Sequence, residues 1–148
     1  MKKIFLIGYI IILGIFTAGC SEEETLKDGY YTAEMKDFSF GWKEFVTITV
    51  KNNKIEAVEY NAKNASGFIK SWDNAYMRNM NSVVGIYPNK YTREYANQLL
   101  QKQGYENIDA ITGASESGEN FKLLARAVVE QARKGDSSIA YVESVNVE

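Results

Sequence analysis

Residues 45–60 read FVTITVKNNKIEAVEY, and this stretch decides the fold. Over residues 45–50 every second side chain is apolar and β-branched, a period-two pattern that is typical of a strand with one buried face. Asn52 and Asn53 follow, and asparagine tolerates the positive φ that a tight hairpin turn requires. We therefore expect residues 55–60 to return as an antiparallel strand.

The segments on both sides of this hairpin indicate the fold class. Residues 30–35 alternate in the same way and predict a third strand. Farther on, the apolar spacing becomes helical in three windows, which are residues 72–84, residues 92–104 with Thr92 as N-cap and Gly104 as stop, and residues 119–134. A last apolar stretch at residues 139–147 is a candidate edge strand. The sequence predicts an α+β fold, an antiparallel sheet meander with helices packed on it, in a single small domain.

Composition removes several classes of site. The chain has 148 residues, with no histidine and one cysteine. It therefore lacks Ser-His-Asp and Cys-His catalytic sets, and it offers no His-ligated zinc or haem site, internal disulfide or iron–sulfur cluster. A formal net charge of −2 gives no long-range attraction for nucleic acid. We expect no metal site, and redox chemistry would need a bound cofactor.

The start of the chain resembles that of a bacterial lipoprotein. Two lysines precede an apolar run that ends at Phe16, and residues 18–20 read AGC, which is similar to a lipobox. We expect a signal peptide over residues 1–19, a lipid anchor on Cys20 and an acidic tether up to residue 27. The alternative, a permanent membrane helix, is disfavoured because two glycines interrupt the short apolar run. The expected location is the bacterial cell membrane, facing outside the cytoplasm.

Residues 109–118 read DAITGASESG and lie directly before the clearest helical window. Small and hydroxyl residues at a helix N-terminus favour anion binding, because the first backbone N–H groups are unpaired and the positive end of the helix dipole points there. The alternative is that Ser115 or Ser117 only caps the helix. Glu116 and Glu119 favour that alternative, since carboxylates in the first turn already satisfy the dipole.

Part of this segment resembles the motif Asp-x-x-Ser/Thr-Gly-Ala-Ser/Thr of the FMN-binding domain family. The matching residues are Asp109, Thr112, Gly113, Ala114 and Ser115. That family includes the C subunit of sodium-pumping NADH:quinone oxidoreductases, the G subunit of Rnf complexes and small surface flavolipoproteins of extracellular electron transfer. Residues 28–34, 41–46 and 117–132 also resemble the lipoprotein branch.

The resemblance implies that FMN is the cofactor and that a dedicated flavin transferase joins it to Ser115 through a phosphoester bond. The family's usual acceptor is threonine, and serine offers the same hydroxyl. Ser117 is a second candidate acceptor, and non-covalent binding of FMN by its phosphate is the other mode. The resemblance places an FMN-binding domain at residues 28–135, followed by a tail or edge strand at residues 136–148.

The isoalloxazine ring would need an apolar or aromatic surround. Most of the chain's aromatic side chains are expected in the core. The candidates for ring contact are Phe40, Trp42, Trp72, Tyr76, Tyr87 and Tyr91. Trp42 is preferred because it lies in a non-periodic stretch with no strand face to bury the indole. Candidates for pairing with a phosphate are Lys70, Lys90 and Arg93.

Two functions from different classes follow from these residues. The first is a one-cofactor electron carrier between a membrane-bound donor and an external acceptor, without a catalytic residue set of its own. The second is a surface lipoprotein that binds a small ligand or a partner protein, with Ser115 serving only as a helix cap. A hydrolytic role has little support because Ser115 has no histidine base.

Overall fold

The computed structural model describes residues 25–144. The expected signal peptide at residues 1–19, the expected lipid anchor Cys20 and residues 21–24 of the tether lie outside the described residues, as do residues 145–148 of the tail. The described chain forms one four-stranded sheet and three α-helices, which confirms the α+β class.

The sheet contains β1 (Gly29–Met35), β2 (Lys43–Lys51), β3 (Lys54–Lys63) and β4 (Ala140–Val142), in the order β3-β2-β1-β4. The first three strands form the predicted antiparallel meander. β4 pairs parallel to β1, so the complete sheet is mixed. The direction follows from the preceding helix, which ends beside the start of β1, where the backbone N–H of Lys27 donates to the carbonyl of Ala132 at 2.9 Å. From there the chain runs toward the other end of β1, where residues 140–142 pair with residues 33–35 in the same direction.

The predicted hairpin is confirmed in detail. Asn52 and Asn53 join β2 to β3 with φ values of 52° and 61°, the left-handed region that such a turn requires. The inner face of β2 carries Val46, Ile48 and Val50, all buried. On the outer face, the hydroxyls of Thr32 and Thr47 lie 2.9 Å apart across the β1–β2 pair.

The first two helices differ in part from the prediction. α1 (Asn74–Val84) follows a short 3₁₀ turn, η1 (Lys70–Trp72), and Asp73 caps it by accepting a hydrogen bond from the backbone of Tyr76 at 2.9 Å. α2 (Pro88–Lys102) begins before the expected N-cap Thr92, which instead lies buried inside the helix. The reason is Pro88, whose fixed φ suits the first turn of a helix and whose missing N–H costs nothing there.

α3 (Ser115–Lys134) also begins earlier than the predicted residue 119. Ala114, which has no polar side chain, holds the N-cap position, so neither Ser115 nor Ser117 caps the helix. The alternative of a serine cap is therefore wrong. Both serines lie inside the helix, and the Ser117 hydroxyl donates to Glu44 of β2 instead of capping the helix. The predicted C-terminal end is correct, with Gly135 in the left-handed conformation at φ 72°.

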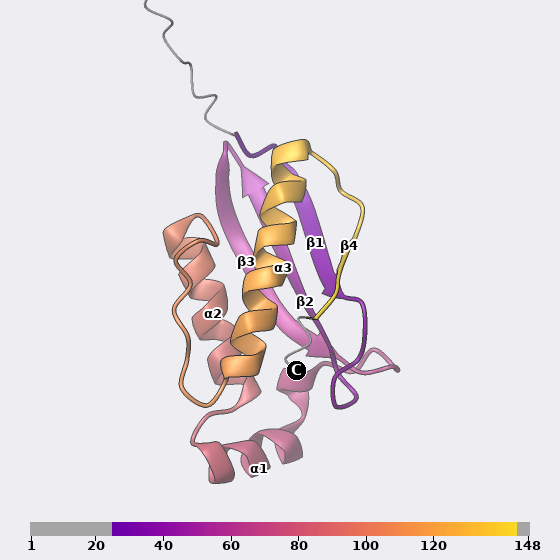
Figure 1. The fold of residues 1–148 in the computed structure, drawn as a ribbon, viewed down its shortest axis with the longest axis vertical. Helices are drawn as coiled ribbons and strands as arrows, with labels where there is room; N and C mark the ends of the chain where they lie inside the picture. Colours follow the sequence, from indigo (N-terminus) through magenta and orange to yellow (C-terminus); the bar gives the residue numbers. More distant parts are fainter. Residues whose placement is uncertain (1–24, 145–148) are drawn as a thin grey trace, which may run out of the picture.

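α2 and α3 cover the inner face of the sheet, and the core lies between these two helices and the strands (Figure 1). Phe121 of α3 lies between two buried tyrosines, with ring centroids 4.7 Å from Tyr60 and 5.3 Å from Tyr95. In Figure 1, α3 starts near α1 at the lower end of the sheet and ends beside the start of β1 at the upper end. The segment that resembles the flavin motif therefore lies at the opposite end of the domain from residue 25.

Candidate functional site

The loop between α2 and α3 carries the motif residues and is held by one tyrosine. The hydroxyl of Tyr95 accepts a hydrogen bond from the backbone N–H of Ile111 at 3.0 Å and donates one to the carbonyl of Ala114 at 3.2 Å. Gly118 faces this hydroxyl so closely that an added Cβ would lie 2.2 Å from it. Sequence analysis did not identify this role, because helical spacing marks Tyr95 only as a core residue.

Gly113 is required by the geometry of the same loop. Its φ is 82°, which glycine adopts without strain, and an added Cβ would lie 3.0 Å from the side chain of Ile86 and 3.3 Å from the carbonyl of Val84. The backbone N–H of Ala114 donates to the carbonyl of Ile111 at 3.0 Å and closes a turn directly before α3. Glycine at this motif position therefore has a local structural cause.

Ser115 is the first residue of α3 and is exposed. It lies where two cavities meet, one of about 360 Å³ and one of about 700 Å³. The smaller is called the Lys70 cavity here, because Lys70 lines it. The larger is called the Met35 cavity, because Met35 lines it together with Phe38 and Leu123. The residues that line both cavities are Ser39, Trp42, Glu44, Ser115, Glu116 and Asn120.

Trp42 reaches this junction from a tight turn. Ser39 and Trp42 exchange two backbone hydrogen bonds of 2.8 and 2.9 Å, which explains why residues 39–42 show no strand period. Phe40, at the tip of the turn, has a φ of 49° and a side chain that is 89% exposed. The edge of the Trp42 ring meets Tyr76 at a centroid distance of 6.0 Å. The structure thus brings Trp42 and Ser115 together.

Of the other aromatic candidates for contact with the ring, three lie at the Lys70 cavity and two lie elsewhere. Phe40, Tyr76 and Tyr91 line the Lys70 cavity. Trp72 is 64% exposed and packs edge-on against Phe68, beside a third cavity elsewhere on the surface. Tyr87, at the N-cap of α2, lines neither the Lys70 cavity nor the Met35 cavity.

Lys70 is the candidate cation that lies at the site. Its Nζ lies 5.0 Å from the ring centroid of Tyr76 and 5.9 Å from that of Trp42. No carboxylate oxygen of residues 25–144 comes within ion-pair distance of this Nζ. Burial opposes the charge, but the hydroxyls of Tyr91 and Tyr76 and the carboxylate of Glu44 raise the pKa of Lys70 overall. Lys70 therefore stays protonated at neutral pH and gives this cavity a positively charged lining residue.

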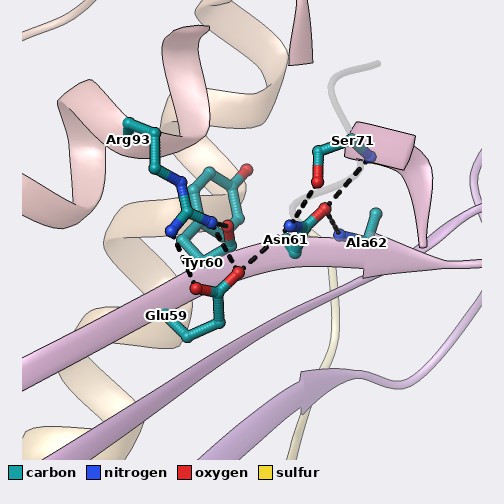
Figure 2. Close-up of polar contacts among 6 residues, drawn as sticks. All are labelled: Glu59, Tyr60, Asn61, Ala62, Ser71 and Arg93. Atoms are coloured by element: carbon teal, nitrogen blue, oxygen red, sulfur yellow. Dashed lines mark hydrogen bonds and ion pairs between the residues drawn. The ribbon is translucent and has the colours of Figure 1, made fainter. Parts of the chain in front are cut away.

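Lys90 and Arg93 lie elsewhere. Lys90 is exposed and lines neither of the two cavities. Figure 2 shows that Arg93 reaches from α2 to β3, where it forms a two-pronged ion pair with Glu59 at 2.8 and 2.5 Å. Asn61 continues this cluster by donating to Glu59 at 3.1 Å and to the hydroxyl of Ser71 at 2.8 Å. Arg93 is thus already paired.

Glu44 is the residue of this site that sequence analysis missed. It is only 8% exposed, although it lines both cavities. Ser117 donates to one carboxylate oxygen at 2.8 Å, Asn120 donates to the other at 2.7 Å, and the Tyr60 hydroxyl lies 3.0 Å from the first. Burial raises the pKa of Glu44, with these donors and Lys70 acting against it. A signal was present, because Glu44 continues the inward register of Val46 on β2.

The remaining motif residues are placed differently. Asp109 is exposed and pairs with Lys102 at 2.8 Å, and the hydrogen bond from Lys102 lowers the pKa of Asp109. Thr112 is exposed and lines neither cavity. Gly113, Ala114, Ser115 and Ser117 line the Lys70 cavity. The N-terminal half of the motif thus shapes the loop, and the C-terminal half faces the cavity.

Within residues 25–144, no helix is both long enough and apolar enough to cross a membrane. In the same residues, no group of three or more His, Cys, Asp or Glu side chains is placed so that it could hold a metal ion.

Comparison with known proteins gives a relative and two similar folds. The chain is 36% identical over 129 residues to a 15 kDa lipoprotein of Treponema pallidum (strain Nichols), and the match covers 86% of this chain and 91% of the relative. A crystal structure of a Clostridium perfringens protein matches with a TM-score of 0.76 and 36% identity, over 80% of this chain and 98% of that one.

A solution NMR structure of a Clostridium thermocellum protein matches with a TM-score of 0.50 and 29% identity, over 77% of this chain and 95% of that one. No model of a protein family matches the chain. The names of these three proteins mention no flavin and no electron transfer.

Proposed function

Because the chain belongs to the family of the 15 kDa lipoprotein, we propose that it is a membrane-anchored lipoprotein whose domain binds FMN and carries electrons outside the cytoplasmic membrane. The relative's name supports the lipoprotein part of this proposal, with acyl chains on Cys20 as the anchor. The FMN part rests on the site and on the motif at residues 109–115.

A single observation carries the FMN proposal, which is the position of the Ser115 hydroxyl. It is exposed at the first residue of α3 and lies between a cavity with a cation and a cavity with an apolar wall. FMN has matching parts, a phosphate at one end and a flat aromatic ring at the other. A phosphoester on Ser115 would place the phosphate at a helix N-terminus, which favours negative charge.

The residues present fit such a group. Within residues 25–144 Lys70 forms no ion pair with a carboxylate, and its positive charge would offset the charge of the phosphoester. Gly113 and Ala114, the two small residues before Ser115, line the Lys70 cavity. Trp42, Phe38 and Met35 give the larger cavity the apolar surface that the ring needs. When bound, FMN supplies the electron-transfer chemistry that the side chains of this protein lack.

The proposal implies a carrier rather than a stand-alone enzyme. Its partners are a flavin transferase that modifies Ser115, a membrane-bound electron donor and an external electron acceptor. Tyr95 and Gly118 have a supporting role, because they hold the loop in which Ser115 is presented. A covalent link suits a protein outside the cytoplasm, where a dissociated cofactor is lost by dilution.

The test is co-expression of the chain from Cys20 onward with a flavin transferase, followed by an absorption spectrum and an intact mass. The wild type should be yellow and heavier by one FMN minus water. Ser115→Ala should lose the added mass, whereas Ser117→Ala, the matched hydroxyl deletion two residues on, should keep it. A colourless, unmodified wild type would contradict the FMN proposal, and a yellow protein with unchanged mass would indicate non-covalent FMN.

One observation favours the second candidate, a surface lipoprotein that binds a ligand without a phosphate. The carboxylates of Glu116 and Glu44 line the same cavities as Ser115, and negative charge there opposes a phosphate. In that case the Ser115→Ala variant would retain ligand binding, and no flavin would be found in the wild type.

A further inference from the structure

The buried carboxylate of Glu44 has no place in the binding of FMN as described above. We propose that Glu44 takes up a proton when a redox cofactor in the adjoining cavities gains negative charge, an inference that rests on the proposed function. The bound group would thereby have a reduction potential that depends on pH through this side chain.

The first support is the position of Glu44. Among the described residues two glutamates are buried, and they lie on opposite faces of the sheet. Glu34, on the outer face, forms an ion pair with Lys63 at 2.5 Å. Glu44, on the inner face, lines both cavities and has no cation within 4.0 Å in the described chain. A buried charge without an ion pair responds strongly to a new charge nearby, because little water screens it.

The second support is a hydrogen-bond network that accommodates both protonation states. The Tyr60 hydroxyl lies 3.0 Å from a Glu44 oxygen and 2.8 Å from the backbone carbonyl of Ser117. Its single proton can turn toward either acceptor. With Glu44 ionised, Tyr60 donates to the carboxylate. With Glu44 protonated, Tyr60 donates to the carbonyl and its oxygen accepts the new proton, so neither state leaves a buried polar atom unpaired.

The third support is the balance of charges around the carboxylate. Lys70 of η1 favours the ionised form, while burial favours the neutral form. Tyr60 of β3 and Tyr91 of α2 are neutral because burial raises the pKa of both hydroxyls. Glu116 of α3 lines the same cavities but is exposed. An added negative charge in the cavities would therefore shift this balance toward protonated Glu44.

The proton and electron balance is simple. Electrons enter the bound flavin from an external reductant, which is oxidised. The proton comes from solvent and forms an O–H bond on a Glu44 oxygen, in addition to any proton that the ring itself takes up. No covalent bond of the protein breaks.

The test is the midpoint potential of the FMN-loaded protein, measured by spectroscopic titration with dithionite at a series of pH values, for the wild type and Glu44→Gln. Above the pKa of Glu44 the wild type carries an extra negative charge, so its potential should be lower than that of the variant. As the pH falls through that pKa, Glu44 becomes neutral and the two curves should converge. Glu116→Gln is the matched control, and its shift should be smaller and reduced by salt.

A second variant keeps the inference testable if Glu44→Gln does not fold. Asn120→Ala removes one donor to the carboxylate and disfavours its ionised form. Its curve should therefore bend at a higher pH than that of the wild type. If the loaded wild type and Glu44→Gln give parallel or coincident curves, the role of Glu44 is wrong and the FMN proposal stands. If the wild type binds no flavin, both proposals are wrong.

Discussion

Two polar clusters meet β3 from different sides, and they handle charge in opposite ways. In the surface cluster of Figure 2, Arg93 and Glu59 neutralise each other in a two-pronged ion pair. In the inner cluster, Glu44 and Lys70 lie near each other without forming an ion pair. A cluster that only supports the fold can satisfy its charges internally. The inner cluster leaves a cation and a carboxylate facing a cavity, which is what a ligand site requires.

The pKa directions follow the same division. Burial acts to raise the pKa of Glu59, but hydrogen bonds from Arg93 and Asn61 lower it overall. Burial raises the pKa of Glu44 in spite of three donors. The difference arises because Glu44 is buried more deeply than Glu59, and because a guanidinium in direct contact stabilises a carboxylate more than neutral hydroxyl and amide donors do.

The largest expected effect comes from Gly118→Ala, which should displace the start of α3 and with it the residues that contact the inner cluster. The new Cβ would lie 2.2 Å from the Tyr95 hydroxyl, so the start of α3 must move away from α2. Overpacking of this kind costs about 1–3 kcal/mol. Urea unfolding should show the loss. Gly104→Ala is the control, because its Cβ meets only the flexible end of Glu106 and should cost less than ~1 kcal/mol.

Tyr95→Phe should have the next largest effect. It removes both hydrogen bonds to the motif loop and leaves the N–H of Ile111 and the carbonyl of Ala114 without this partner. The expected cost is about 1–2 kcal/mol, with faster amide exchange in residues 111–114. Tyr105→Phe, which loses one hydrogen bond to Glu130, should cost less than half as much. Equal losses would mean that Tyr95 does not hold the loop.

The two glutamates should respond to acid with opposite signs. Glu44 has a raised pKa in the folded state, so its contribution to stability grows as the pH falls through that value. Glu59 has a lowered pKa, so its contribution is lost as the pH falls. On acidification from about pH 7 to about pH 4, near the ordinary glutamate pKa, Glu44→Gln should lose more unfolding free energy than the wild type. Glu59→Gln should lose less unfolding free energy than the wild type over the same pH range. If both variants deviate from the wild type in the same direction, the two carboxylates do not differ in this way.

The smallest expected effect is that of Arg93→Met. The ion pair with Glu59 is almost half exposed, so its loss should cost about 0.2–1 kcal/mol, and less at high salt. Flavin loading by the transferase should be unchanged, as judged by intact mass. Lys70→Met is the matched variant in the inner cluster, and it should reduce flavin loading. If both variants load equally well, Lys70 has no part in holding the phosphate.

Much of the fold could be predicted because it depends on local properties. The alternation at residues 45–50 and the two asparagines at the turn specify the hairpin, since strand period and positive φ are properties of a few neighbouring residues. The end of α3 at Gly135 was predictable for the same reason. The start of α2 was not, because Pro88 looks like a helix breaker until its position at the first turn is known.

The candidate site was only partly predictable. Ser115 and Trp42 were named from motif and context, and the structure brings them together. Glu44 was missed, although an acidic residue in an otherwise apolar register is an unusual inward position. The role of Tyr95 in holding the motif loop could not have been predicted. A helical period shows which face of the helix carries the side chain, but not which backbone groups its hydroxyl will contact.

By itself, the sequence determined the strands, the hairpin and the long helix, along with the loop of small residues before it. Those features follow from side-chain period and backbone preference over short distances. Only the tertiary structure decided which groups surround Ser115. Glu44, Lys70 and Trp42 come from other parts of the chain, and they meet Ser115 because the start of α3 packs across the start of β2, beside η1. The energetic reason is burial of the apolar face of α3 on the sheet, which brings these polar groups to the same place.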